Sequence, residues 1–440
     1  MTEAKVKNMY TDFVYPAYDE MLDEKAPELI QTRQNNLKFF SHYFYKGRKT
    51  NFDNFKILFA GAGLGSCLIH LALLLKKYKN IKITAIDLSP SSLEILRKRL
   101  DIYKIEGVEI IEMSLLDLDP EKVGKFDMIN CVGVLHHLEN PSLGLRALKN
   151  VLEDDGFMEV MVYGKIGRTG IYQMQDLLKM ANKEVEELDY STKLENYKKI
   201  YPFLQQNNWF KKSEMLGPDH LTMGDNGVID LLLHHQDRAY TIPELYHWVE
   251  GEDLNIVEFM TCTRFKLKKN IEGIEFKTEK EKYAFNELFF GDLIKHSFYI
   301  SKNNDTVAEI DDLNNIMILN NLIQPEWDNL MKKLEELGHC YPNPELNFNF
   351  NYYTFNNTEV LLKTPHQGNV RFKSDFVTNY ILKNIDGIKK TKRLFTNLRE
   401  DLKLDITNEE LLERFRPVYD AFNMHDVLLL KRDDRILSFN

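Results

Sequence analysis

The stretch KILFAGAGLGSCLIHLALLLKKYKNIKITAID, residues 56–87, decides the fold. It opens on a short, mainly apolar run of the kind that is buried in parallel sheets. A glycine-rich turn at 61–65 leads into residues 67–77, whose apolar positions predict a helix. Residues 81–86 predict a second strand, which ends on Asp87. This order predicts a strand–helix–strand unit of a parallel α/β sheet.

The residue types in this unit suit a bound nucleoside. Gly61, Gly63 and Gly65 permit the positive φ angles and the close backbone approach of a tight turn. The helix that follows offers free N–H groups at its N-terminus to a polar or anionic ligand. Asp87 stands about 20 residues downstream, where a carboxylate can bind the two hydroxyls of a ribose. Together these features predict nucleoside binding.

The glycine spacing distinguishes between nucleosides. Dinucleotide-binding proteins have Gly-x-Gly-x-x-Gly, whereas this loop is Gly-x-Gly-x-Gly, which disfavours a nicotinamide-dependent oxidoreductase. The loop resembles motif I of the class I S-adenosylmethionine (SAM) methyltransferases. Three later stretches resemble successive motifs of that family: IDLSPSSL at 86–93, FDMINCVGVLHHL at 126–138 and LKNVLEDDGFM at 148–158. The resemblance implies a SAM-dependent methyltransferase with an α/β, Rossmann-like sheet of seven strands.

Some positions depart from the family pattern. Phe59 stands where members often carry an acid, and two residues, Ser114 and Asp117, are candidates for the role of the usual acid after the third strand. These departures motivate a second hypothesis, a catalytically degenerate SAM- or nucleoside-binding regulatory protein. The glycines and Asp87 are intact and favour an active enzyme.

The carboxyl ends of the predicted strands locate the ligand. In an open α/β sheet the ligand lies beyond these ends, and Ser114, Val132 and Tyr163 follow or end predicted strands. The resemblance implies SAM as the cofactor and the following cofactor-binding residues: Gly61, Ala62, Gly63, Gly65, Asp87, Leu88, Ser114, Leu115, Val132 and Gly133.

Methyl transfer depends on alignment of the two reactants, with the reacting atoms about 3–3.5 Å apart. A nitrogen or hydroxyl acceptor also benefits from a base. The polar segment 229–240 is either part of the acceptor site or a salt-bridged turn, and His136 and His137 either face the site or cap their turn. The expected catalytic residues are His137, Tyr163, His234, Asp237 and Tyr240.

The length of 440 residues predicts two or three domains. We expect an N-terminal helical segment at 1–50, which either covers the cofactor as a lid or packs on the core. We expect the methyltransferase domain at 51–302, with a helical insertion after the fifth strand at about 165–228. The smaller, α-rich accessory domain is expected at 306–440, with helices near 324–337, 377–386 and 409–423.

Composition limits the binding partners and the cellular compartment that the sequence predicts. The net charge of −10 argues against a dedicated nucleic-acid binder. The four cysteines lack paired spacing, so no metal site is expected. The N-terminus shows no signal peptide and no apolar run is long enough to span a bilayer, which predicts a cytoplasmic protein without membrane contact. The sequence does not predict the oligomeric state.

The acceptor is the least determined part of the prediction. The segments GVLHHLENP at 133–141 and HHQDRAYTIPELYHW at 234–248, with the appended C-terminal domain, resemble a bacterial methyltransferase group that includes rickettsial protein-lysine methyltransferases. The resemblance implies a protein side chain, such as that of lysine, as the acceptor. A small-molecule acceptor stays open.

Overall fold

The computed structural model describes residues 2–16, 37–187, 189–260, 274–319, 358–364 and 368–432. The chain divides into two compact units. The first comprises residues 1–32, 52–260 and 264–304, and the second comprises residues 33–51, 261–263 and 305–440.

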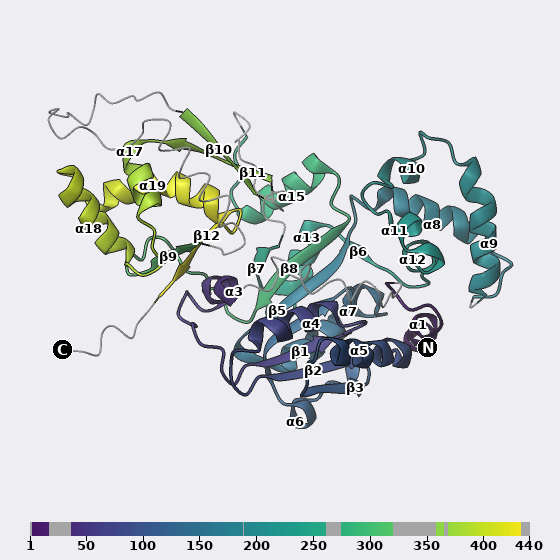
Figure 1. Cartoon of the computed structure of the whole chain (residues 1–440). Helices are drawn as coiled ribbons and strands as arrows, with labels where there is room; N and C mark the ends of the chain where they lie inside the picture. Colours follow the sequence, from purple (N-terminus) through teal and green to yellow (C-terminus); the bar gives the residue numbers. More distant parts are fainter. Residues whose placement is uncertain are drawn as a thin grey trace. The chain divides into compact units, whose positions relative to one another are not determined.

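The first unit is built on an eight-stranded, mostly parallel sheet (Figure 1). Its strands are β1 (Lys56–Ala60), β2 (Lys82–Asp87), β3 (Val108–Glu112), β4 (Phe126–Val132), β5 (Leu152–Gly164), β6 (Ala239–Tyr240), β7 (Asn255–Phe259) and β8 (Lys295–Ser301). The order is β3-β2-β1-β4-β5-β8-β7, and β6 pairs with β5. β8 is antiparallel to β5 and β7. The seven-stranded Rossmann-like sheet is confirmed, and the two-residue β6 is an addition to it.

Helices pack against the sheet, and α4 (Ser66–Leu75) lies where the sequence pattern predicts a helix at 67–77. The others include α5 (Pro90–Ile102), α6 (Pro120–Val123), α7 (Pro141–Asn150), α13 (Ile242–Glu250) and α15 (Glu279–Phe290), with the 3-10 turns η2 (Leu115–Asp117) and η3 (Leu135–His137). The hydroxyl of Ser89 caps α5 by accepting the Ser92 N–H. Thr241 and Glu244 form a capping box at the start of α13. The ends of these helices are therefore specified locally.

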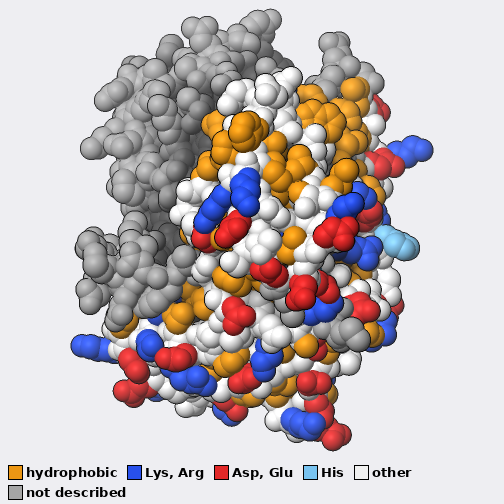
Figure 2. All heavy atoms as spheres, turned by 90° about the vertical axis from the view of Figure 1, so that its right-hand side faces the viewer, with side chains coloured by type: hydrophobic (Ala, Val, Ile, Leu, Met, Phe, Trp, Pro, Cys, Tyr) orange, Lys and Arg blue, Asp and Glu red, His pale blue; other side chains and the backbone are white. Residues whose placement is uncertain are grey.

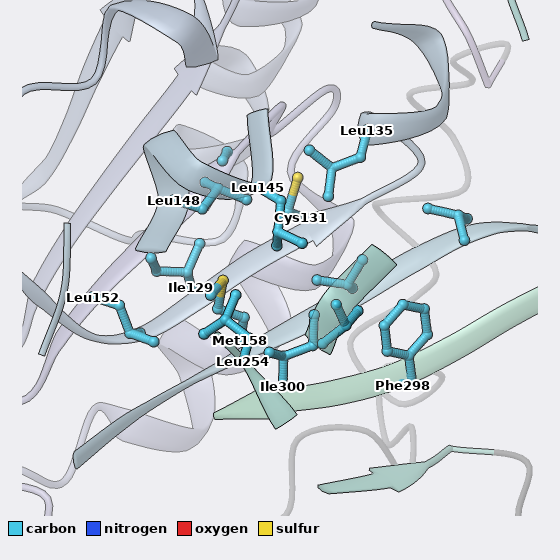
Figure 3. Packing of buried hydrophobic residues seen from close by; sticks show 14 of the residues in the cluster. Ile129, Cys131, Leu135, Leu145, Leu148, Leu152, Met158, Leu254, Phe298 and Ile300 are labelled. Atoms are coloured by element: carbon cyan, nitrogen blue, oxygen red, sulfur yellow. The ribbon is translucent and has the colours of Figure 1, made fainter. Parts of the chain in front are cut away.

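The main core of the first unit lies between α7, α13 and one face of β4, β5 and β8. Side chains from these elements interdigitate (Figure 3), among them Ile129, Leu145, Met158 and Phe298. All four are fully buried. This core holds the carboxyl ends of the strands in fixed positions.

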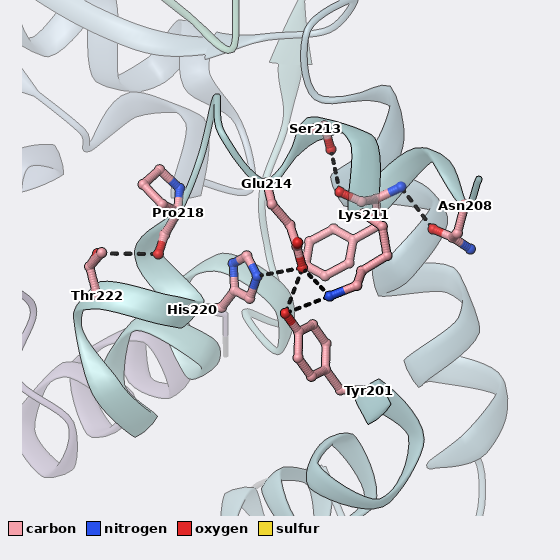
Figure 4. Close-up of polar contacts among 9 residues, drawn as sticks. Tyr201, Asn208, Lys211, Ser213, Glu214, Pro218, His220 and Thr222 are labelled. Carbon is pink, nitrogen blue, oxygen red and sulfur yellow. Dashed lines mark hydrogen bonds and ion pairs between the residues drawn. The ribbon is translucent and has the colours of Figure 1, made fainter. Parts of the chain in front are cut away.

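The helical insertion follows β5, as predicted. It consists of α8 (Thr169–Ala181), α9 (Tyr190–Ile200), η4 (Tyr201–Phe203), α10 (Trp209–Ser213), α11 (Asp219–Thr222) and α12 (Gly224–Leu232). One carboxylate oxygen, Glu214 Oε1, joins three of these elements (Figure 4). It lies 2.7 Å from the Tyr201 hydroxyl, 2.9 Å from Lys211 Nζ and 3.2 Å from His220 Nε2. This network fixes the insertion around a small core of its own.

The N-terminal segment expected at 1–50 is divided between the two units. Helix α1 (Thr2–Asp12) packs on α5 in the first unit, whereas α3 (Leu37–Phe44) belongs to the second. The aromatic side chains of α3 are buried, and His42 Nδ1 accepts the Leu430 N–H over 3.1 Å. Because α3 is apolar on most of its surface, burial in a core stabilises it more than a place over a polar site would.

The second unit combines two small antiparallel sheets with helices. β9 (Ile316–Leu319) pairs with β12 (Leu428–Lys431), and β10 (Thr358–Thr364) pairs with β11 (Gly368–Ser374). The helices α17 (Phe376–Lys383) and α19 (Asn408–Asn423) match two predicted ones, and α18 (Thr391–Leu402) was not predicted. The helix expected at 324–337 lies outside the described residues.

The face of the molecule in Figure 2 carries Lys and Arg side chains interspersed with Asp and Glu, and hydrophobic side chains gather toward its upper part. Within the described ranges, none of the helices has the length and apolar character needed to cross a bilayer.

Candidate active site

The glycine loop leaves open space at one position. Gly61, Gly63 and Gly65 have φ angles of 76°, 52° and 75°. A Cβ on Gly61 would come within 2.2 Å of Val134, and a Cβ on Gly65 within 2.2 Å of Leu96. A Cβ on Gly63 would meet no atom within 4 Å. The outer glycines are therefore needed for packing, and the middle one faces a space that a ligand can occupy.

Asp87 is tied to this loop. Its Oδ2 accepts the Gly63 N–H over 2.8 Å, and its Oδ1 accepts the Ser89 N–H over 2.8 Å. Burial raises the pKa of the Asp87 carboxyl, and these backbone hydrogen bonds oppose the shift. A carboxylate offers about four lone-pair sites. Asp87 thus keeps acceptor capacity for the hydroxyls of a ribose.

The turn after β3 holds two more of the expected cofactor residues. The Ser114 hydroxyl bonds the Glu3 carboxylate and also accepts the Leu116 N–H over 3.0 Å. The Leu115 side chain is 5% exposed and belongs to the main core. Ser114 therefore faces the N-terminal helix, and the Leu115 side chain supports the turn from within the core.

Other expected cofactor residues lie at the ends of β1, β2 and β4. The Ala62 N–H donates to the Ile86 carbonyl oxygen over 2.9 Å. Leu88 directly follows Asp87 and is partly exposed, as is Val132 at the end of β4. Gly133 has a φ angle of 81°. These residues share the sheet edge at which the open space before Gly63 lies.

Helix α1 covers this edge of the sheet. Lys7 Nζ lies 2.6 Å from the Glu112 carboxylate at the end of β3. The Ser89 hydroxyl donates to the Tyr10 carbonyl oxygen over 3.0 Å, and the Ser91 hydroxyl donates to the carbonyl oxygen of Thr11 over 3.0 Å. The N-terminal helix therefore lies over the strand ends rather than on the outside of a helical layer.

Four histidines and a tyrosine form a cluster beside helix α1. The His137 and His234 rings stack with centroids 4.0 Å apart, and the His136 and Tyr163 rings lie 3.8 Å apart. The rings of His234 and His235 also stack, at 5.3 Å. Residues from η3, β5 and the segment after α12 thus converge on one place.

The protonation of His137 follows from its partners. Its Nδ1 lies 2.9 Å from the Gln236 carbonyl oxygen, which only accepts hydrogen bonds, so Nδ1 carries the proton. Burial lowers the pKa of His137 to about 4, although the hydrogen bond to Gln236 opposes this shift. Burial also lowers the pKa values of His136 and His234. These three rings are neutral at pH 7, and His137 Nε2 has a free lone pair 3.5 Å from the Tyr10 hydroxyl.

Arg168 and Asp237 form a buried ion pair in the same cluster. Arg168 Nη2 lies 3.2 Å from Asp237 Oδ2, and the side chains are 3% and 5% exposed. The guanidinium lies 3.6 Å from the centroid of the Tyr163 ring. Gln175 Nε2 donates to the same Asp237 oxygen over 3.1 Å. Asp237 thus neutralises Arg168.

Asp230 is a second buried carboxylate, on α12. It is 4% exposed, and its Oδ1 accepts the Tyr10 hydroxyl over 2.8 Å. Burial raises the pKa of Asp230 to about 6, while the Tyr10 hydrogen bond and the Arg168 charge oppose the shift. Since Arg168 is paired with Asp237, ionised Asp230 leaves the cluster with excess negative charge.

Tyr240 lies apart from this cluster, contrary to its expected catalytic role. Its ring belongs to the main core and stacks on Trp248, with centroids 5.0 Å apart. With Arg238 it lines a surface hollow of about 280 Å³ beside α13. Tyr240 follows Ala239 in β6, and because successive strand residues point to opposite faces, its position depends on the register with β5.

Comparison with known proteins bears on the family and the fold of the chain. Residues 58–158 match a family model described as a methyltransferase domain. An uncharacterised protein of Synechococcus is 32% identical over 253 residues, which cover 57% of this chain and 59% of that protein. A probable (S)-tetrahydroprotoberberine N-methyltransferase of Papaver bracteatum is 21% identical over 235 residues, covering 53% of this chain and 54% of that protein. The matches thus span less than two thirds of either relative.

Among solved structures, PKMT2 from Rickettsia typhi has a similar fold. The TM-score is 0.58 at 16% sequence identity, and the match covers 95% of this chain and 77% of that chain. Residues 58–158 therefore form a methyltransferase domain, and PKMT2 shares the fold of the chain. This confirms the family resemblance of the four sequence motifs.

Within the methyltransferase domain, the structure brings together most of the expected site residues. His137, Tyr163, His234 and Asp237 lie in one cluster, and the glycine loop and Asp87 lie at the same sheet edge. Sequence reasoning did not name Tyr10 or Asp230 as site residues. A signal for Asp230 was its acidic side chain within the apolar run of α12.

Proposed function

We propose that this chain is a SAM-dependent methyltransferase that transfers the methyl group to an amine. The described residues fit SAM: the space before Gly63 admits a ligand, and Asp87 retains lone pairs for a ribose. PKMT2 from Rickettsia typhi, which shares the fold, has been solved in complex with AdoHcy, the demethylated product of SAM. When bound, SAM supplies an electrophilic methyl group on a sulfonium centre.

The observation that carries the choice of an amine is the excess negative charge at Asp230. The buried cluster contains one Arg168 cation, the anions of Asp237 and Asp230, and neutral histidines. A buried carboxylate without a cationic partner is costly. An ammonium group in the site would compensate this charge.

The residues then have separate tasks. Asp230 binds the ammonium form of the acceptor and takes its proton, which frees the nitrogen lone pair for attack. His137 Nε2, with its own lone pair, orients an N–H of the acceptor. The Arg168–Asp237 pair holds the Tyr163 ring in place. Burial of the cluster excludes water and strengthens these electrostatic interactions.

A lysine side chain is the amine we favour, because the sequence resembles the group that includes rickettsial protein-lysine methyltransferases. A small amine is the other member of the same chemical class. The Papaver bracteatum relative is named as an N-methyltransferase, which also favours a nitrogen acceptor. We assign the cofactor, the chemistry and the acceptor site at Asp230 to the first unit.

The test is methyl transfer from radiolabelled SAM to a set of acceptors. The set should contain polylysine, small primary and secondary amines, and matched hydroxyl compounds of the same size. We expect label in the amines only, and at least a hundredfold less with Asp230→Asn. Label in the hydroxyl compounds alone would refute the proposal that the acceptor is an amine. Binding of SAM without turnover on any acceptor would favour the regulatory alternative.

A further inference from the structure

A path of hydrogen bonds joins the cofactor side of the site to the acceptor side. Asp87 Oδ1 accepts the Ser89 N–H over 2.8 Å, and the Ser89 hydroxyl donates to the Tyr10 carbonyl oxygen over 3.0 Å. The Tyr10 hydroxyl in turn donates to Asp230 Oδ1 over 2.8 Å. Only Ser89 and Tyr10 stand between the carboxylate expected to bind ribose and the carboxylate expected to bind the acceptor.

The segment that carries Tyr10 is held on both sides. Toward α5, the Ser91 hydroxyl donates to the carbonyl oxygen of Thr11 over 3.0 Å. Toward the insertion, Asn226 Nδ2 donates to the carbonyl oxygen of Val14 over 2.7 Å, and Met9 is buried in the core of the insertion. Tyr10 therefore reaches Asp230 only when the segment is docked on both the α5 turn and the insertion.

The surroundings of Tyr10 suit a positioning role. Its ring meets the His137 ring edge-on with centroids 6.2 Å apart and lies 5.8 Å from the His234 ring. Its hydroxyl is a donor to Asp230 and contacts His137 Nε2 at 3.5 Å. One side chain from the N-terminal helix therefore touches both groups that the proposed function assigns to the acceptor.

We propose that Tyr10 is a positioning residue that couples the two halves of the site. It orients the Asp230 carboxylate when α1 is docked on the α5 turn, which contains Ser89. Cofactor binding and the geometry of the acceptor site therefore depend on each other. The inference rests on the proposed function, because it takes Asp87 and Asp230 as the two binding carboxylates. Binding of the acceptor and of the cofactor would then affect each other equally, and we expect a substitution at Asp230 to alter the affinity at the cofactor site.

A double-mutant cycle on the full chain tests this coupling without a known acceptor. Calorimetry would give the affinity for AdoHcy of the wild type, Tyr10→Phe, Asp230→Asn and the double variant. We expect each single variant to bind about five- to tenfold more weakly, and the double variant to bind no more weakly than the weaker single one. Thr11→Val is the control, because among the described residues the Thr11 hydroxyl bonds only the Lys7 carbonyl of its own helix. It should bind AdoHcy like the wild type, and thermal melting should show all four variants folded.

A pH profile separates positioning from a merely structural role. The Tyr10 hydrogen bond lowers the pKa of Asp230, so Tyr10→Phe should shift the acidic limb of the methyl-transfer profile to higher pH. An unshifted limb would overturn the proposal. The proposal would also be overturned if the fold-losses in AdoHcy affinity of the two single variants multiplied in the double variant. It would equally be overturned if both single variants bound AdoHcy within twofold of the wild-type affinity. If the proposal is overturned in one of these ways but the wild type binds AdoHcy, the proposed function is not refuted. A wild type that does not bind AdoHcy would refute both the coupling and the proposed function.

Discussion

The Gly63 N–H donates a hydrogen bond of 2.8 Å to Oδ2 of Asp87, which ties the glycine loop after β1 to the end of β2. The bond fixes two groups expected to contact SAM, a backbone turn and a carboxylate, relative to each other. Such preorganisation reduces the entropy lost when a ligand binds.

Gly63 and Gly65 should respond differently to the same substitution. Both have positive φ angles, so valine adds backbone strain at either site. At Gly63 the new side chain enters open space. We therefore expect SAM binding to be lost, while the melting temperature falls only by the amount that the backbone strain causes. At Gly65 it would collide with Leu96, and we expect a larger loss of stability. Calorimetry and thermal melting of the two variants measure both effects. Equal melting temperatures with intact SAM binding by Gly63→Val would contradict this account.

The pH dependence of methyl transfer should follow Asp230. Its pKa is about 6 because of burial, and it must be ionised to take the proton of the amine. The groups that act on it electrostatically or by hydrogen bonding include Tyr10, Arg168, Asp219 and Asp237. We expect kcat/KM at saturating SAM to rise tenfold per pH unit below about 6 and to level off above it. A profile that rises only above pH 8 would point to another base.

Replacement of Asp237 should destabilise the fold. Asp237→Asn leaves the Arg168 guanidinium buried without an anionic partner, and removal of one partner of such a pair costs about 3–5 kcal/mol. Asp176→Asn removes the carboxylate of an exposed pair with Lys179 on α8 and serves as the control. Urea unfolding of both variants gives the comparison. Equal midpoints would show that the Arg168–Asp237 pair contributes no more than a surface pair.

Glu159 on β5 should make stability depend on pH. The side chain is 2% exposed, and burial raises its pKa from 4.5 to about 7. The folded chain then binds more protons than the unfolded chain between these values, so stability falls as pH rises through this range. We expect the unfolding free energy to drop by about 2 kcal/mol more between pH 5 and pH 8 in the wild type than in Glu159→Gln. Parallel urea curves at the two pH values test this, and an identical drop in both proteins would rule out the assignment to Glu159.

The sequence predicts best what is local in the chain. The strand, glycine turn, helix and Asp87 all lie within residues 56–87, and their residue types are tied to backbone geometry. The end of β5 at Tyr163 and the turn at His137 follow from the rule that ligands lie beyond the carboxyl ends of strands. The sequence therefore places these residues at the same sheet edge as the structure does, and their roles stay predictions.

The remaining parts depend on contacts between distant segments. Tyr10 and Asp230 are 220 residues apart, and no local pattern shows that α1 lies against the insertion. The expected role of Tyr240 failed because the register of the short β6 turns its ring into the core beside Trp248. The place of α3 in the second unit follows from tertiary burial of its aromatic side chains. Such contacts are set by packing, which residue types alone do not specify.

The measurement that tests the central claim most directly is calorimetric titration of the full chain with SAM, with NAD in parallel. We predict that the wild type binds SAM and not NAD, and that Asp87→Ala weakens SAM binding by roughly 1–3 kcal/mol, the loss expected for hydrogen bonds to a charged group. A folded wild type that binds no SAM, or an Asp87→Ala variant with unchanged affinity, would contradict the account.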